Sequence, residues 1–187
     1  MWEEIEMKRA LALALWLGLS PLAALSGEAG DAVFAERGPW SLTDDGLVWS
    51  LHVEGPEAPG FVPVDDGSVT LGRATDPSDG QPVLQLTRKA DQRSRQIGPF
   101  PISGGDPVLT FFLEQTARDM AGLTGGSPFY IRNRLKDALF RGGEITHEGA
   151  TATATFRPFA DDPNAARMQG FQTLTLTFVM DNPARPI

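Results

Sequence analysis

Apolar and polar residues alternate in the first half of the chain, after residue 46, and again near its C-terminus, which predicts strands in both regions. From Leu47 to Val53 every second residue is apolar, a period typical of a half-buried strand. Shorter strands are expected over residues 68–73, 83–87 and 93–98. Asp-Gly pairs favour tight turns because both residues tolerate positive φ, and they occur at 45–46, 66–67 and 79–80. We therefore expect the first half to form an antiparallel meander.

In the middle of the chain the apolar period becomes helical. Asp106 precedes Pro107, and Ser127 precedes Pro128; each pair is typical of an N-cap followed by proline at the first helical position. Apolar residues then recur at helical spacing until the glycine pairs at 125–126 and 142–143, which are expected to end the two helices. The pattern predicts a helical hairpin.

Strict alternation returns near the C-terminus. Alanine alternates with threonine from Ala150 to Phe156, and a second alternating run spans residues 173–180, so two strands are expected. Residues 161–168 between them are expected to form a loop or a short helix. The order predicts an α+β fold, an antiparallel sheet, open or curved into a half-barrel, with the helical hairpin inserted and packed on one face. The small alanines leave space that either the helices or a ligand must fill.

The N-terminus has the order of a secretory signal. Lys8 and Arg9 precede an apolar run over residues 10–19, and small residues follow up to Ser26. Cleavage is expected after Ser26, with Ala29 as the alternative, and the acidic residues before Met7 make Met7 an alternative start. The apolar run is shorter than the ~20 residues of a membrane-spanning helix. Residues 27–187 are then expected to form one domain without a transmembrane segment.

Composition narrows the classes of partner and compartment. The chain has 24 acidic and 16 basic residues and a formal net charge of −8, which disfavours nucleic-acid binding. It has no cysteine, which excludes disulfides and thiolate sites. A small exported domain without cysteine indicates a bacterial envelope protein, placed in the periplasm. Residues 28–79 carry 11 acidic and two basic residues, so the two halves of the chain differ in charge.

Catalytic motifs are absent, which favours a non-enzymatic protein, and we expect no cofactor. The chain has two histidines, His52 and His147. His52 falls on the polar face of its strand and is expected to be solvated. His147 could act as a general base if Asp119 or Glu144 oriented it, and it could equally be a polar strand residue near a bend at Gly149. A pair of carboxylates could also support hydrolysis, but no pair stands out, and no metal site is predicted.

The second helix carries the most distinctive stretch. Its start exposes backbone N–H groups, and Arg132, Arg134 and Lys136 follow within two turns, a pattern that can hold a phosphate or carboxylate. The alternative is a solvated basic face with an Arg134–Asp137 ion pair. The aromatic residues nearby either line a cavity or belong to the core. The predicted ligand-binding residues are Phe111, Phe112, Phe129, Tyr130, Arg132, Arg134 and Lys136.

The order of exported strands, helix pair and closing strands is similar to that of the open half-barrels of periplasmic lipid or lipoprotein carriers, an analogy of architecture only. The leading hypothesis is a soluble envelope protein that binds an apolar or amphiphilic ligand such as a lipid. The alternative is a protein-interaction module that assists an envelope complex, and a third possibility is a hydrolase.

Overall fold

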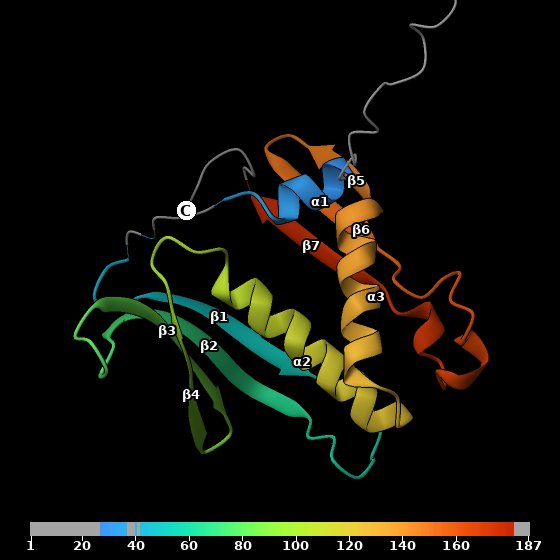
Figure 1. The fold of residues 1–187 in the computed structure, drawn as a ribbon, viewed down its shortest axis with the longest axis horizontal. Helices are drawn as coiled ribbons and strands as arrows, with labels where there is room; N and C mark the ends of the chain where they lie inside the picture. Colours follow the sequence, from blue (N-terminus) through green and yellow to red (C-terminus); the bar gives the residue numbers. More distant parts are fainter. Residues whose placement is uncertain (1–26, 37–39, 41, 182–187) are drawn as a thin grey trace, which may run out of the picture.

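The computed structural model describes residues 27–36, 40 and 42–181. Over this part of the chain, three α-helices and two antiparallel sheets form an α+β fold, as predicted. The predicted signal peptide, residues 1–26, lies outside the described residues. Figure 1 shows the two sheets side by side with the helices between and around them.

The first sheet, sheet A, is the predicted meander. Its strands are β1 (Leu47–Val53), β2 (Val64–Thr75), β3 (Pro82–Ala90) and β4 (Arg93–Phe100). They are neighbours in chain order, and each pair is antiparallel. The bounds of β1 agree with the predicted strand, because its alternating apolar positions are the half-buried ones.

Two of the three Asp-Gly pairs lie in turns, and the third lies inside a strand. Gly80, with φ at 72°, lies in the turn between β2 and β3 as expected. Gly46, with φ at 69°, lies in a turn that precedes β1. The expected turn at Asp66-Gly67 is wrong, because both residues lie inside β2. A Cβ at Gly67 would lie 2.9 Å from Lys89 O and 3.0 Å from Leu51 O. Glycine is needed there because the adjoining strands approach closely.

The two predicted helices are α2 (Pro107–Thr124) and α3 (Pro128–Arg141). Asp106 caps α2 by accepting hydrogen bonds from the backbone N–H groups of Val108 and Leu109, and Ser127 caps α3. Gly125, with φ at 67°, ends α2 in the left-handed conformation. A short helix that was not predicted, α1 (Glu28–Val33), precedes the sheets. It is too short to show a periodic pattern in the sequence.

The second sheet, sheet B, follows the helices. Its strands are β5 (Glu144–Glu148), β6 (Thr151–Phe156) and β7 (Leu176–Asp181), with β6 in the centre. Strands β6 and β7 are the two predicted ones. Between them are two short 3₁₀ helices, Ala165–Arg167 and Phe171–Thr173. Since the strands of the described residues divide between two sheets, a single curved half-barrel is not confirmed.

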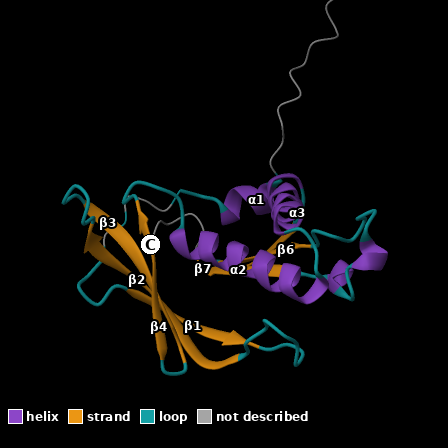
Figure 2. Ribbon diagram, turned by 60° about the horizontal axis from the view of Figure 1, so that its bottom comes forward, coloured by secondary structure: helices purple, strands orange, loops and turns teal. Residues whose placement is uncertain are grey.

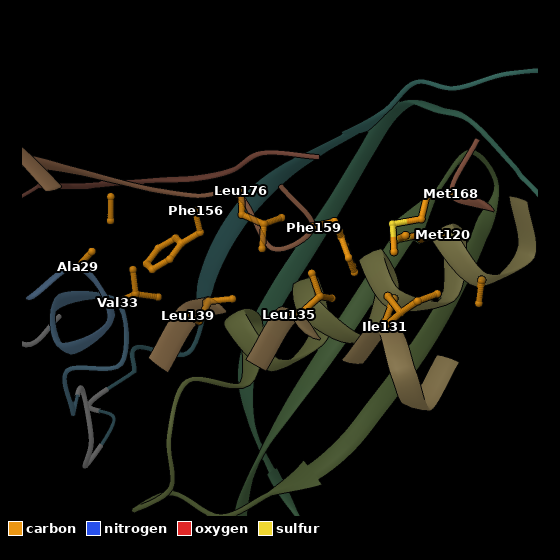
Figure 3. Packing of buried hydrophobic residues seen from close by; sticks show 13 residues of the cluster. Ala29, Val33, Met120, Ile131, Leu135, Leu139, Phe156, Phe159, Met168 and Leu176 are labelled. Carbon is orange, nitrogen blue, oxygen red and sulfur yellow. The ribbon is translucent and has the colours of Figure 1, made fainter. Parts of the chain in front are cut away.

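Sheet B and the helices enclose the larger hydrophobic core, core B. Figure 3 shows Ile131, Leu135 and Leu139 in a row along α3, facing residues of sheet B and of the segment between β6 and β7. Phe156 and Phe159 on that side are at most 1% exposed. The buried members of core B are Ala29, Val33, Ala117, Met120, Ala121, Ile131, Leu135, Leu139, Ala154, Phe156, Phe159, Met168 and Leu176.

The smaller core, core A, lies on the inner face of sheet A. Its buried members are Trp40, Val69, Leu71, Leu84 and Leu86. Helix α2 packs against both cores: Val108 and Phe111 contact core A, whereas Leu109 and Leu113 contact core B. Figure 2 shows the helices on one side of sheet A, with α2 nearest to it. Helix α2 therefore joins the two halves of the fold.

The alanines of β6 are explained by close packing. Ala152 and Ala154 are fully buried, and α1 and α3 lie on the same side of sheet B. Helix α1 also approaches α3 closely, because a Cβ at Gly30 would lie 2.2 Å from the backbone oxygen of Leu139. The space that the small side chains leave is occupied by helices at these positions.

Candidate functional site

The predicted basic residues of α3 are placed on the helix surface, and two of them are paired with carboxylates. Arg132 donates through Nη2 to Glu114 Oε2 at 3.0 Å and through Nε to Oε1. This hydrogen bond is the main reason that the pKa of Glu114 lies below its usual range. Arg134 Nε lies 2.7 Å from Asp162 Oδ2. Lys136 lies over the ring of Phe140, with Nζ 5.9 Å from the ring centroid.

Asp162 is the buried charged residue that sequence reasoning missed. Asp162 is 5% exposed. Its carboxylate oxygens lie 2.8 and 2.9 Å from Tyr130 Oη, which donates to them, and one of them also accepts a hydrogen bond of 2.8 Å from the backbone N–H of Asn164. The side chain of Asn164 donates to Tyr130 Oη. Burial by itself raises the pKa of Asp162, but these hydrogen bonds and the charge of Arg134 outweigh it, so the pKa lies below its usual range.

This hydrogen-bond network assigns a structural role to two of the predicted ligand-binding residues, Tyr130 and Arg134. Tyr130 and Arg134 connect α3 to the loop after β6, and a carboxylate so fully paired is a structural anchor. The Arg134–Asp137 pair considered from the sequence is replaced by this contact, while Asp137 lies 3.8 Å from Arg141. The sequence Asp162-Pro163-Asn164 is typical of a turn closed by an aspartate side chain. This pattern could have indicated from the sequence that Asp162 has a structural role.

The four predicted aromatic residues are distributed over different surroundings. Phe111 contacts core A and Tyr130 contacts core B. Phe112 is 42% exposed and packs edge-on against Phe178. Phe129, at the start of α3, is 68% exposed. The structure therefore does not bring these side chains together at one place, and their role in ligand binding stays a prediction.

The two histidines lie on the surface, in strands of different sheets. His52 is exposed as expected, and its ring nitrogens lie 3.0 Å from Glu54 Oε1 and 3.2 Å from the backbone oxygen of Asp65. His147 belongs to β5, next to the turn at Gly149. Its Nε2 lies 3.8 Å from Glu28 Oε1. The carboxylate near His147 is therefore one that the sequence did not suggest, rather than Asp119 or Glu144.

An open groove lies where core B reaches the surface. It has a volume of about 540 Å³ and lies between the loop after β1, the last turn of α2 and the loop around the second 3₁₀ helix. Its apolar lining residues are Pro56, Ala58, Leu123, Phe171 and Leu174. Phe171 and Leu174 also pack against core B, so this wall of the groove is supported by the core.

The wall formed by residues 169–174 is fixed by its own backbone. Gln169 and Gly170 both have positive φ, at 50° and 100°. The Gly170 N–H donates to the side chain of Gln172, and the Thr173 hydroxyl donates to the Gly170 carbonyl. These polar groups are paired within the loop, which presents Phe171 and Leu174 to the groove beside Gln169, Gly170 and Thr173. None of the groove residues was singled out from the sequence.

Other kinds of site find no support in the part of the chain that the structure describes. Its histidine, aspartate and glutamate side chains form no group of three or more that could hold a metal ion. None of its helices is long and apolar enough to cross a membrane.

Comparisons with protein-family models, with curated proteins and with solved structures found no match to this chain.

Proposed function

We propose that this protein is an exported, non-enzymatic binding protein of the bacterial periplasm that holds the apolar part of an amphiphilic ligand, such as a lipid, in the groove at Leu123, Phe171 and Leu174. The groove carries the proposal. Its volume falls within the range of ~300–1,000 Å³ that is common for small-molecule sites, and its lining is mostly apolar.

Two further features support binding without chemistry. The groove wall at residues 169–174 is held by hydrogen bonds within its own loop, and a preorganised wall lowers the conformational entropy that the protein loses on binding. Its lining includes no histidine, aspartate, glutamate or lysine, which are the usual acid and base groups of enzymes. Export and periplasmic location rest on the residues before Gly27, whose sequence order is that of a secretory signal.

Native mass spectrometry of the protein purified gently from a bacterial periplasm tests the proposal, followed by organic extraction of the bound material. We expect a stoichiometric amphiphile. A Leu123→Trp variant fills the groove and should lose that ligand. A Val179→Trp variant should retain it, because Val179 is a 68% exposed residue of sheet B.

A folded Leu123→Trp variant that retains its ligand would reject the groove as the site. A wild-type protein that carries no ligand and does not bind added dodecanol would reject the function, and the protein-interaction module would then be the better explanation. An exposed pair supports that second candidate: the rings of Phe34 and Phe140 stack with their centroids 4.8 Å apart, and the residues are 37% and 41% exposed.

A further inference from the structure

Three arginines lie close together on the face of sheet A that α2 covers. Arg88 of β3 is the register partner of Arg95 of β4. Arg93 is the partner of Ala90, two residues nearer to the turn between these strands. The register partner of Arg88 on its other side is Val69, a buried residue of core A. Since side chains alternate between the faces of a strand, all three arginines belong to the inner face. Like charges directly opposite each other destabilise a sheet.

Among the residues that the structure describes, Arg88, Arg93 and Arg95 form no ion pair within the chain. In the described residues, the ion pairs of arginine involve Arg132, Arg134, Arg141 and Arg157. The Nε atom of Arg88 is buried and has no hydrogen-bond partner. A buried donor without an acceptor is unfavourable, so an acceptor from outside the chain would stabilise this position. Arg93 and Arg95 are exposed and can be reached from solvent.

Helix α2 supplies one carboxylate on the facing side. Asp119 is half-buried, and its Oδ1 accepts a hydrogen bond from Gln115 Nε2 at 2.7 Å. Burial raises the pKa of Asp119, while the Gln115 hydrogen bond and the charge of Arg88 act in the opposite direction. Asp119 acts on Arg88, whereas Arg93 and Arg95 form no ion pair with a described residue, so these two guanidinium groups keep their positive charge available.

Helix α2 connects this positive region to the groove, because the Asp119 carboxylate interacts with Arg88. Leu123, which lines the groove, comes four residues after Asp119 and therefore lies one helical turn, roughly 6 Å, further along the same face of α2. The loop on the opposite wall carries Glu54 and Glu57, both exposed. A ligand with a negative end would avoid that loop and turn the end towards the arginines.

We propose that Arg88, Arg93 and Arg95 bind the anionic head group, a carboxylate or a phosphate, of an amphiphile whose apolar chain occupies the groove. This inference rests on the proposed function and adds the charge of the ligand and its orientation. Paired guanidinium groups suit both head groups, because they donate parallel hydrogen bonds to oxyanions.

Calorimetric titration with dodecanol, dodecanoate and dodecyl phosphate, each kept below its micelle concentration, tests the inference. The three probes share one apolar chain and differ in the head group. We expect at least one anionic probe to bind about tenfold more tightly than dodecanol at low salt, the gain typical of a charge-assisted hydrogen bond. The preferred anion distinguishes a fatty-acid type of ligand from a phospholipid type.

The Arg88→Gln/Arg95→Gln double variant should lose this preference and still bind dodecanol. Arg95→Gln alone, at an exposed position, should lose part of it and serves if the double variant does not fold. Arg73→Gln is the matched control, because Arg73 pairs with Leu84 on the same face towards the other end of β3. That variant should keep the preference.

The outcomes separate the two proposals. Equal binding of all three probes by the wild-type protein would overturn the anion site and leave the groove in place. An anion preference that survives Arg88→Gln/Arg95→Gln and disappears in Arg132→Gln would assign the head group to α3 instead. Binding of no probe would overturn the proposed function itself.

Discussion

Tyr130 and Asp162, 32 residues apart in the sequence, are joined by hydrogen bonds of 2.8 and 2.9 Å from one phenol hydroxyl to both carboxylate oxygens. With Arg134 on the same carboxylate, the contact fixes the loop after β6 to α3. The groove wall at residues 169–174 belongs to the chain that continues from this loop, so the contact also contributes to the position of the candidate site.

Replacing Asp162 with asparagine should destabilise the protein. The variant loses the negative charge that faces Arg134 and one strong acceptor, and breaking a partly buried pair of this kind costs about 2–4 kcal/mol. Chemical denaturation measures the change in the free energy of unfolding. Asp161→Asn is the control, because Asp161 is exposed and should change stability by at most about 0.5 kcal/mol. Equal effects of the two substitutions would contradict the role of the anchor.

The same carboxylate should make stability depend on acid pH. The pKa of Asp162 in the folded protein lies below 3.8, the ordinary value for an aspartate side chain. The ionised form therefore contributes stability above the unfolded-state pKa, and this contribution is lost as the pH falls through the folded-state pKa. Denaturation at a series of pH values should show the difference between wild type and Asp162→Asn shrinking below about pH 4. A difference that is constant down to pH 2.5 would be inconsistent with the lowered pKa.

His52 should titrate with a pKa above 6.5, the ordinary value for a histidine side chain. Its hydrogen bond to Glu54 is the main cause, and the bond to the backbone oxygen of Asp65 adds to it. A raised pKa stabilises the folded protein below the unfolded-state value, and that contribution is lost as the pH rises through the folded-state value. NMR titration of the ring protons measures the pKa directly. Glu54→Gln should lower it, and an unchanged pKa in that variant would assign the shift elsewhere.

Two glycine-to-alanine substitutions in helices should have opposite effects. In Gly30→Ala the new Cβ would lie 2.2 Å from the Leu139 backbone oxygen, so α1 must move away from α3 at a cost of about 1–3 kcal/mol. Gly122 in α2 has no atom within 4 Å of the added Cβ, and alanine there should stabilise by about 0.5–1 kcal/mol. Thermal and chemical denaturation measure both. A neutral Gly30→Ala variant would show that α1 is not held against α3.

The caps of the two long helices should differ in strength. Asp106 accepts hydrogen bonds of 2.8 and 3.0 Å at the start of α2, whereas Ser127 accepts one of 3.4 Å at the start of α3. Asp106→Ala should therefore cost about 1–2 kcal/mol. Ser127→Ala should cost less, and circular dichroism during denaturation compares them. The reverse order would indicate that the hydrogen bonds at the caps do not decide the stability of these helices.

Local patterns in the sequence predicted the elements with the strongest local causes. The meander, the two capped helices and strands β6 and β7 follow from period, proline and glycine, which act within a few residues. The division into two sheets did not follow, because strand pairing depends on contacts between distant segments. Gly67 illustrates the limit: its Asp-Gly sequence is typical of a turn, yet the close approach of Leu51 and Lys89 requires the glycine inside β2.

The candidate site was less predictable than the fold. Arg132 and Arg134 were identified as cations, but their partners Glu114 and Asp162 lie 18 and 28 positions away along the chain. No periodic pattern connects such positions. The groove depends on three separate segments, and Leu123 is an ordinary apolar helix residue until the fold places Phe171 beside it.

Helix α2 gives Val108 and Phe111 to one core and Leu109 and Leu113 to the other. Sheet A loses the helix that covers it if α2 leaves, and sheet B keeps only the cover of α1 and α3. Heating should therefore melt both sheets in one calorimetric transition. If the chain is cut between β4 and α2, the two fragments should regain their structure only when they are mixed. We therefore expect the two sheets to fold as one cooperative unit, although their strands pair separately.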